Sequence, residues 1–181
     1  MPITKWEISD EAAAKAFKWA KHKASTIKNK GVIMPNPSFD GVDHINIYSK
    51  GSTELGRFLS NFTHCPIIIA DGPFASIEGY WYWIGSGDER LRTLYGYNAK
   101  KVGKKLPRTQ ILTEEAFHSK IRDACWIKVH SQQSMLTTFT QSTLPFTHYY
   151  AYGNKVIDAG YRWLVEMWEQ YRAYIKNNYI T

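Results

Sequence analysis

Cysteine is scarce in this sequence, and long apolar segments are missing from it. Only two cysteines occur, Cys65 and Cys125, too few for a disulfide-stabilised scaffold or for a zinc site with four thiolate ligands. No run of about 18 apolar residues is present, which excludes a membrane-spanning helix. Charged residues between Lys5 and Glu11 interrupt the apolar stretch that a secretory signal peptide would need. We therefore expect a soluble, cytoplasmic protein.

Positive charge and aromatic side chains, in contrast, are abundant. The 23 Lys and Arg outnumber the 16 Asp and Glu, giving a net charge of +7. This excess favours anionic partners such as nucleotides, nucleic acid or phosphorylated small molecules. Aromatic residues make up 15% of the chain, far more than a disordered protein would carry. The 181 residues suit one domain with a single buried core.

The hydrophobic pattern predicts an α+β fold that is mostly helical. Helices are expected over residues 9–24, 77–85, 91–105, 113–129 and 155–176, with a further helical pattern at 131–142. Two short strands are expected over residues 42–49 and 66–70. The second strand should be buried, and Asp71-Gly72 should form the turn that follows it. No internal repeat is present.

Three segments combine polar and aromatic residues in a way that suits ligand binding. They are residues 57–67, 75–81 and 148–153. In the first, the polar pair Ser60-Asn61 lies between Phe58 and Phe62, just before the second strand. Such a pair can hydrogen-bond a small polar ligand while a phenylalanine stacks on its ring. The alternative is a structured turn whose polar side chains are satisfied internally.

The second segment contains Glu78, two residues after Ser76, the expected N-cap of a helix. The helix macrodipole and free amides stabilise a carboxylate at this end, so we expect Glu78 to be ionised at neutral pH and competent as a general base. The alternative is dipole pairing alone, worth about 0.3–1 kcal/mol. The aromatic run at 80–83 should lie mostly in the core, although Trp81 or Tyr82 can stack on a base.

Four motifs follow one another along the chain. They are Ile45-Asn46-Ile47-Tyr48-Ser49, Leu59-Ser60-Asn61-Phe62, Cys65-Pro66-Ile67 and Ser76-Ile77-Glu78-Gly79-Tyr80. Their types and spacing resemble the YbiA-like, or NADAR, superfamily, with its Phe-Tyr-Ser strand, Leu-Ser-Asn-Phe turn and Ser-Glu-His-Tyr helix start. Weaker matches are Ala99 to Lys104, Lys128, Tyr149 to Gly153 and Gly160-Tyr161. The resemblance covers residues 43–181 as a divergent member, and residues 1–42 form an N-terminal helix and connecting loop outside it.

The resemblance implies an N-glycosidase, which hydrolyses the bond between a ribose phosphate or ADP-ribose and a nitrogenous base. Substrate classes of the family include early riboflavin-pathway intermediates and ADP-ribosylated guanine. The glutamate at Glu78 carries much of that activity, and Arg57 and the basic residues at 100–105 would meet phosphates. The residues expected to bind substrate are Tyr48, Arg57, Ser60, Asn61, Phe62, Trp81, Lys104, Tyr149 and Tyr150, and no cofactor or metal is expected.

The sequence departs from the family's pattern at three places. Gly79 replaces the histidine after the glutamate, and Ile84-Gly85 replaces a Gln/Lys pair whose amine could trap an opened sugar. Tyr150-Ala151-Tyr152 replaces a Trp-Gly-Asp trio, which removes a carboxylate. We therefore expect His148 to be the second catalytic residue, because a histidine titrates in the range suited to a proton donor.

Two functions of different classes remain open on the sequence. One is an active N-glycosidase acting on a phosphorylated ribosyl or ADP-ribosyl small molecule. The other is a binding protein that has lost the chemistry and sequesters a nucleotide-like ligand or nucleic acid. Retention of Glu78 favours the first, and the missing Asp and Lys favour the second. His148 has its own alternative, an ordinary histidine in a loop that packs on the last helix with Tyr150 beside Trp163.

Overall fold

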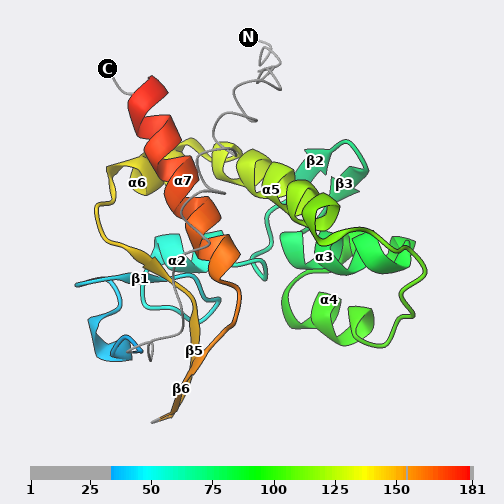
Figure 1. The fold of residues 1–181 in the computed structure, drawn as a ribbon, viewed down its shortest axis with the longest axis horizontal. Helices are drawn as coiled ribbons and strands as arrows, with labels where there is room; N and C mark the ends of the chain where they lie inside the picture. The colour runs from blue at the N-terminus through cyan, green and yellow to red at the C-terminus, as the bar shows by residue number, and fades with distance from the viewer. Residues whose placement is uncertain (1–33, 154, 180–181) are drawn as a thin grey trace.

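The computed structural model describes residues 34–153 and 155–179 and shows an α+β domain (Figure 1). The helix expected over residues 9–24 lies outside the described residues. The α-helices are α2 (Glu54–Leu59), α3 (Ile77–Ser86), α4 (Gly96–Gly103), α5 (Glu114–His130), α6 (Gln133–Gln141) and α7 (Arg162–Tyr179). Two short 3-10 helices, η2 (Pro37–Phe39) and η3 (Glu89–Thr93), precede β1 and α4 respectively.

The strands form three separate two-stranded sheets within the described residues. Strand β1 (Ile45–Asn46) runs parallel to β4 (Phe146–Thr147), with Ile45 opposite Phe146. Strands β2 (Ile67–Ile69) and β3 (Gly72–Phe74) form one antiparallel hairpin, and β5 (Tyr149–Tyr152) and β6 (Lys155–Asp158) form another. The parallel pair joins two segments that are 100 residues apart, and it brings β5 next to the beginning of the domain.

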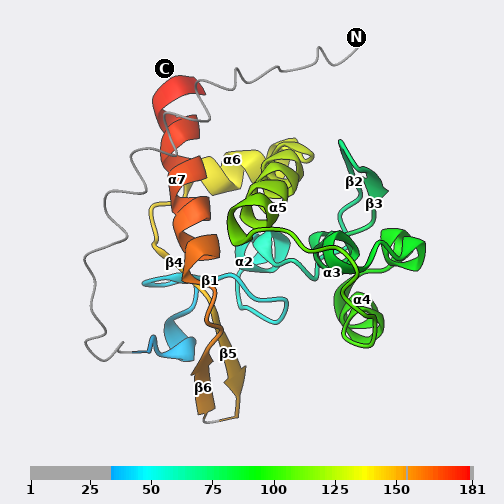
Figure 2. The same ribbon diagram turned by 45° about the vertical axis from the view of Figure 1, so that its right-hand side comes forward.

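Helix α5 connects two groups of elements. On one side it packs against α3 and β2, and on the other against α6, which in turn contacts α7. Figure 2 shows α3 and α4 together on one side of α5, and α7 with β1 and the β5–β6 hairpin on the other. Fully buried side chains from several of these elements, among them Leu59, Ile121 and Trp168, form the core between them. Each such side chain contributes about 1.5–3 kcal/mol through removal from water.

Helices α3 and α5 confirm their sequence prediction, because each has the expected cap. The Ser76 hydroxyl accepts a hydrogen bond from the Gly79 amide at 3.0 Å, and the Thr113 hydroxyl accepts one from the Ala116 amide at 3.2 Å. Helix α6 likewise confirms the helical pattern at 131–142. None of the described helices is long and apolar enough to cross a membrane.

The prediction of a single helix over residues 91–105 is wrong. The chain forms η3, becomes extended at Leu94 and Tyr95, and then begins α4. The cause lies in the neighbouring helix α3: Ser76 donates its hydroxyl proton to the Leu94 carbonyl at 3.0 Å, and the Ala75 amide donates to the Arg92 carbonyl at 2.7 Å. A continuous helix would use these carbonyls internally.

The strand predictions also need correction. Strand β2 forms and is followed by the expected turn, but Ile68 is 78% exposed, so this strand is buried on one face only. The first strand spans only Ile45–Asn46 of the predicted range 42–49. The helix predicted over 155–176 begins only at Arg162, because residues 155–158 pair with β5 instead.

Gly79 allows a close approach between α3 and the chain after η3. A Cβ at this position would lie 2.4 Å from the Leu91 carbonyl oxygen and 2.9 Å from the Leu94 carbonyl oxygen. Both are backbone atoms, which cannot rotate away as the end of a side chain can. The histidine that the family resemblance would place here therefore has no room in this fold.

Replacing Gly79 with alanine should therefore destabilise the protein. We expect Gly79→Ala to lower the free energy of unfolding by about 1–3 kcal/mol, the usual cost of overpacking. Gly85→Ala is the matched control on the same helix, because its Cβ would contact only the Arg108 side chain, at 3.6 Å. The control should stabilise by about 0.5–1 kcal/mol through helix propensity. Urea unfolding measures the change in the free energy of unfolding for each variant. Equal changes in Gly79→Ala and Gly85→Ala would contradict the close approach at Gly79.

Candidate active site

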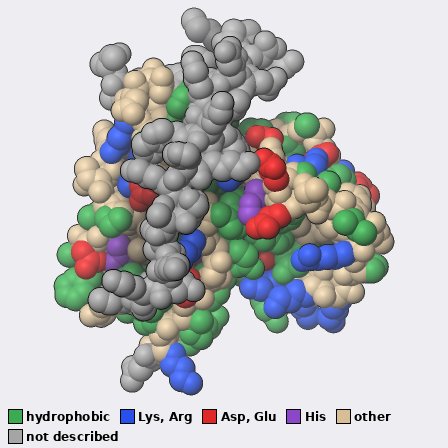
Figure 3. Space-filling model, in the orientation of Figure 1, with side chains coloured by type: hydrophobic (Ala, Val, Ile, Leu, Met, Phe, Trp, Pro, Cys, Tyr) green, Lys and Arg blue, Asp and Glu red, His purple; other side chains and the backbone are tan. Residues whose placement is uncertain are grey.

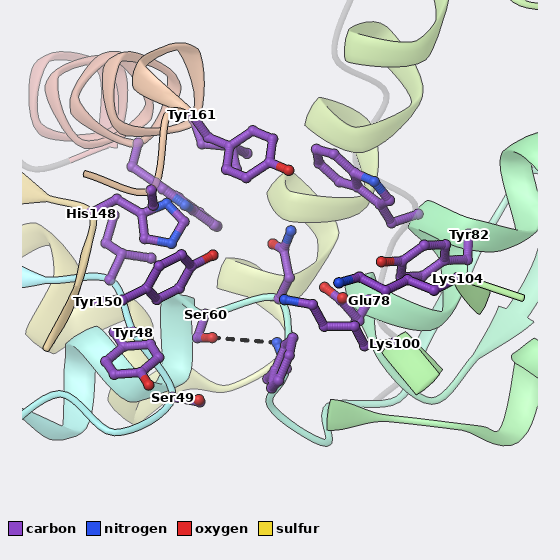
Figure 4. A pocket seen from close by; sticks show the side chains of 17 residues that line it. Tyr48, Ser49, Ser60, Glu78, Tyr82, Lys100, Lys104, His148, Tyr150 and Tyr161 are labelled. Carbon is purple, nitrogen blue, oxygen red and sulfur yellow. Dashed lines mark hydrogen bonds between the residues drawn. The ribbon is translucent and has the colours of Figure 1, made fainter. Parts of the chain in front are cut away.

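A cavity of about 300 Å³ lies between α3 and α4 on one side and β1, β5 and the start of α7 on the other. The residues that line it are Ile47, Tyr48, Ser49, Ser60, Asn61, Phe62, Glu78, Trp81, Tyr82, Lys100, Lys104, His148, Tyr150, Ala159, Tyr161, Leu164 and Trp168. Figure 4 shows Glu78 with Lys100 and Lys104 on one wall, and His148 with Tyr48 and Tyr150 on the other. Its volume is at the lower end for small-molecule sites.

Glu78 enters this cavity from the first turn of α3. Its backbone amide donates to the Asn61 carbonyl at 2.9 Å, which ties the helix start to the turn after α2. Burial raises the pKa of Glu78 to about 7, and the charges of Lys100 and Lys104 partly oppose that increase. The expectation of a fully ionised carboxylate at neutral pH is therefore wrong, because loss of water outweighs the helix dipole. Near pH 7 the acid and its carboxylate coexist.

The two lysines facing Glu78 come from one side of α4. Lys100 and Lys104 lie four residues apart, so both extend into the cavity (Figure 4). Neither forms an ion pair with Glu78. Lys101, on α4, and Lys105, just after it, are exposed and do not line this cavity. Figure 3 shows Lys and Arg side chains gathered over this part of the surface.

Tyr82 completes this wall of the cavity. It lies four residues after Glu78 on the same face of α3, and α4 packs directly against it: a Cβ at Gly103 would be only 2.1 Å from the ring atom Cγ of Tyr82. Burial and, next, the charge of Glu78 raise the pKa of Tyr82 to about 12. Its hydroxyl therefore keeps its proton at neutral pH and can donate a hydrogen bond to a ligand.

The opposite wall is aromatic. The ring of Tyr150 meets that of Tyr48 edge-on at 5.3 Å and that of His148 at 5.7 Å between centroids, and His148 stacks on Tyr161 at 6.1 Å. Tyr150 belongs to β5 and His148 lies just before it, whereas Tyr48 follows β1 and Tyr161 precedes α7. Trp163, the residue expected beside Tyr150, stacks on Trp81. Burial raises the pKa of Tyr150 to about 12, so it too remains a neutral hydroxyl.

His148 lies in the cavity as expected, but its protonation state corrects the expectation. Burial is the main reason that the pKa of His148 falls to about 4, with a smaller effect from Lys100 in the same direction. Its buried Nδ1 atom has no hydrogen-bond partner among the described residues. A neutral imidazole at pH 7 cannot be the proton donor to a leaving group, although it can accept or donate a hydrogen bond.

The base of the cavity is the turn Ser60-Asn61-Phe62, all three residues of which line it. Lys128, fully buried on α5, fixes this turn by donating from Nζ to the Ser60 carbonyl at 2.7 Å. Burial lowers the pKa of Lys128 to about 8. Its ammonium also lies 5.3 Å from the ring centroid of Phe58. The turn is therefore held by long-range contacts from beneath the cavity.

Two residues expected to bind substrate lie away from the cavity. Arg57 donates from Nη1 to the carbonyls of Gly51 and Ser52 at 2.9 and 2.8 Å, so its guanidinium stabilises the loop before α2. Tyr149 is 1% exposed, and its hydroxyl is 2.8 Å from Nε2 of His44. The other predicted site residues, including Trp81, line the cavity. Tyr82, a candidate for stacking on a base, and Lys100, a candidate for contacting phosphate, also line it. Ser49 and Tyr161 line it without having been predicted there.

Neutral burial of His148 should make the protein sensitive to acid. As the pH falls from about 6.5 to 4, the unfolded chain binds a proton at His148 that the folded protein does not, so the contribution of His148 to the free energy of unfolding should fall by up to about 3 kcal/mol, while that of Glu78 changes in the opposite direction. His148→Phe keeps an aromatic ring but cannot bind a proton, so it should abolish this fall in the free energy of unfolding. His64→Phe, at an exposed position, should leave the fall unchanged. Unfolding curves at pH 4.5 and 7 compare the three proteins, and an unchanged acid sensitivity in His148→Phe would contradict the neutral assignment.

Comparison with known proteins relates this chain to others at the level of fold. No protein-family model matches the sequence, and no curated protein matches it either. Among solved structures, the NMR structure of the E. coli protein YbiA superposes with a TM-score of 0.56 and 19% sequence identity, covering 80% of this chain and 94% of that one. The chain has a YbiA-like fold. At this identity the likeness concerns the fold alone, and the activity must be argued from the cavity.

Among the described residues, no three or more His, Cys, Asp or Glu side chains gather as metal ligands.

Proposed function

We propose that this protein is an N-glycosidase that cleaves the bond between a ribosyl phosphate, or an ADP-ribosyl group, and a nitrogenous base. The observation that carries the proposal is the placement of Glu78, a buried carboxyl group with a pKa of about 7, beside two lysines on one wall of the cavity. A carboxylate that titrates near the working pH is well suited to general base catalysis, since it is available in its basic form and accepts a proton readily.

The reaction assigned to Glu78 is activation of water. The carboxylate removes a proton as the water oxygen bonds to C1 of the ribose, and the C1–N bond breaks with its electron pair going to the departing nitrogen. That nitrogen then takes up a proton from solvent, and Glu78 releases to solvent the proton that it accepted from water, which restores the carboxylate. Tyr82 and Tyr150 keep their hydroxyl protons at neutral pH, so they can hydrogen-bond the departing base from either wall. The negative charge of Glu78 also stabilises the positive charge that develops on the sugar.

Phosphate binding is assigned to Lys100 and Lys104. Their ammonium groups extend into the cavity without forming an ion pair with another described residue, so they are available to an anion. Lys100 also lies 5.3 Å from the ring centroid of Phe62. The same cations lower the pKa of Glu78 towards neutrality, which couples phosphate binding to the protonation of the base. Phe62 and Tyr150 supply flat faces on which a planar base can stack.

A second candidate function is binding of the same ligands without chemistry. The specific observation in its favour is that Tyr152, where the family pattern has a carboxylate, is 57% exposed and lies outside the cavity. With His148 neutral, Glu78 is then the sole acid–base group with a pKa near 7 among the cavity residues for which a shift is resolved. A binding protein would form the complex and leave the C1–N bond intact.

The pH dependence of base release separates these functions. Free base is measured by chromatography after incubation with ribosylamino-pyrimidine phosphates and with ADP-ribosylated guanine nucleotides, between pH 5 and 9. We expect the rate to rise with an apparent pKa near 7, as Glu78 loses its proton. Binding without any base release across this range would favour the second function, and a rate that falls through pH 7 would exclude Glu78 as the base.

A further inference from the structure

The motif at residues 45–49 contains a buried asparagine to which the proposed function assigns no role. Asn46 is only 2% exposed and does not line the cavity, whereas Ile47, Tyr48 and Ser49, which follow it, do. A buried amide side chain is costly unless its polar groups are hydrogen-bonded. The partners of Asn46 therefore show which parts of the fold this residue holds together.

The side chain of Asn46 binds both backbone groups of one residue on β5. Its Nδ2 donates to the Tyr149 carbonyl at 3.1 Å, and its Oδ1 accepts from the Tyr149 amide at 3.0 Å. The parallel pairing of β1 with β4 ends at Asn46 and Thr147, after which the Ile47 amide donates to the Thr147 carbonyl at 2.8 Å. An amide side chain offers one donor and one acceptor, as a neighbouring strand does. Asn46 thus extends the parallel pair to the start of β5.

The backbone of Asn46 is fixed as well. Its amide donates to Oδ1 of Asp40 at 2.9 Å, and its carbonyl accepts from the Tyr48 amide at 2.8 Å. A Cβ at Gly56 would lie 2.3 Å from that carbonyl oxygen, so the backbone has no space to move towards α2. All four polar groups of Asn46 are therefore used, and the residue is a fixed point to which β5 is attached.

The alternation of side chains at the start of β5 connects these bonds to the cavity wall. Successive side chains of an extended chain point to opposite faces, so Tyr149 is buried away from the cavity while His148 and Tyr150 both line it. Tyr48, whose amide bonds the Asn46 carbonyl, meets Tyr150 edge-on at 5.3 Å between centroids. Figure 4 shows the three rings together on one wall. A rotation of the chain at Tyr149 would therefore move His148 and Tyr150 together.

A second contact holds the other end of Tyr149. Its hydroxyl lies 2.8 Å from Nε2 of His44, which is itself 4% exposed. The Nδ1 atom of the same imidazole bonds Oδ1 of Asp43, the residue before it. Burial raises the pKa of Tyr149 to about 12, so this hydroxyl keeps its proton. Asn46 thus binds the backbone of Tyr149, and His44 binds its side chain.

We propose that Asn46 is a positioning residue for the ligand-binding wall of the cavity: by holding the Tyr149 backbone, it sets the orientation of His148 and Tyr150. This rests on the proposed function, in which a planar base stacks on Tyr150 while phosphate binds the two cavity lysines of α4. Loss of the Asn46 amide then weakens the contacts to the base and leaves those to phosphate intact, because the lysines belong to a different element.

The environment of His148 tests the positioning role without any ligand. Asn46→Leu keeps the size of the side chain and removes both bonds to Tyr149, and NMR titration of the imidazole measures the pKa of His148. Burial lowers this pKa to about 4 in the wild type. We expect the variant to raise it to about 5 or above, nearer the ordinary value for histidine, because water reaches the ring. Thr113→Ala is the control for lost stability alone, since it removes the cap of α5 outside the cavity, and should leave this pKa unchanged.

Two probes show whether the wall acts on the base. Calorimetry compares guanosine 5′-monophosphate, which carries a base, with ribose 5-phosphate, which has the same sugar and phosphate without one. We expect Asn46→Leu to bind guanosine 5′-monophosphate about tenfold more weakly, the loss expected when a base no longer stacks on an aromatic ring. The variant should bind ribose 5-phosphate as tightly as the wild type does. Thr113→Ala should keep both affinities.

The outcomes distinguish the two proposals. An unchanged pKa of His148 in folded Asn46→Leu, an unchanged affinity for guanosine 5′-monophosphate, or equal weakening of both probes would overturn the positioning role and leave the glycosidase proposal standing. A raised pKa with selective loss of the base-containing probe, in a protein that releases no base, would support the positioning role and overturn the glycosidase proposal.

A second variant covers a failure of the first to fold. Asn46→Ala leaves space in which water can bind the Tyr149 backbone, and both measurements are repeated on it if Asn46→Leu does not fold. If neither variant folds, Asn46 is required for folding itself and the positioning role is overturned. If the wild type binds neither probe, the glycosidase proposal fails, and the titration of His148 alone decides the role of Asn46.

Discussion

Glu78→Gln should reduce base release by a factor of about 10² or more while leaving ligand binding nearly unchanged. Glutamine keeps the size of the side chain and loses the group that accepts a proton from water. The rate of base release and the dissociation constant of ribose 5-phosphate measure the two effects separately. Glu54→Gln is the matched control, because Glu54 also lies in the first turn of a helix but is exposed and does not line the cavity.

The stability of Glu78→Gln distinguishes lost chemistry from lost folding. The folded protein binds the Glu78 proton more tightly than the unfolded chain, so the contribution of Glu78 to wild-type stability falls as the pH rises from about 4.5 to 7. Glutamine does not titrate, so the variant does not lose this stability as the pH rises. We expect the free energy of unfolding of Glu78→Gln, relative to that of the wild type, to increase by about 2 kcal/mol between pH 5 and pH 8. If the variant is inactive and also less stable than the wild type at pH 8, Glu78 is needed for the structure and its role as the base is not supported. Near-normal base release would show that another group is the base.

Removal of both cavity lysines should produce the second large effect. Lys100→Met/Lys104→Met takes away two donors to phosphate, and we expect affinity for ribose 5-phosphate to fall about 10²-fold, since each charged contact is worth about 1.5–3 kcal/mol. The two cations also lower the pKa of Glu78. Their loss should therefore move the rising part of the pH–rate profile above pH 7.

The same helix supplies a matched control for this double variant. Lys101→Met/Lys105→Met removes the same charge from exposed positions outside the cavity. This control should keep both the affinity and the pH profile of the wild type. If α4 instead bound nucleic acid through its overall charge, the two double variants would weaken binding equally and with a steep dependence on salt.

Local signals in the sequence predicted much of the fold. Ser76 and Thr113 fix the starts of α3 and α5, because a cap acts on amides only two or three residues away. The prediction for residues 91–105 was wrong because the carbonyls of Arg92 and Leu94 bind groups at the start of α3, nearly 20 residues earlier in the chain. Strand β6 was missed because pairing with β5, rather than any local preference, decides its structure.

The site could be predicted in position but not in its chemistry. The turn at 60–62 and Glu78 do meet at one cavity, and Tyr82 and Lys100, four residues from Glu78 and Lys104 respectively, line it with them. Protonation could not be predicted, since the pKa of a side chain follows from its burial by other elements. For that reason Glu78 was expected to be ionised but titrates near neutrality, and His148 was expected to titrate near neutrality but is buried with a pKa of about 4.

Single-turnover base release tests the central claim most directly. Excess protein at pH 8 is mixed with a ribosylamino-pyrimidine phosphate or an ADP-ribosylated guanine nucleotide, and the free base and the ribosyl product are quantified over time by chromatography. The account predicts that at least one substrate is converted completely into equal amounts of base and ribosyl product by the wild type, but not by Glu78→Gln. Recovery of both substrates intact, from a protein shown by calorimetry to bind them, would contradict it.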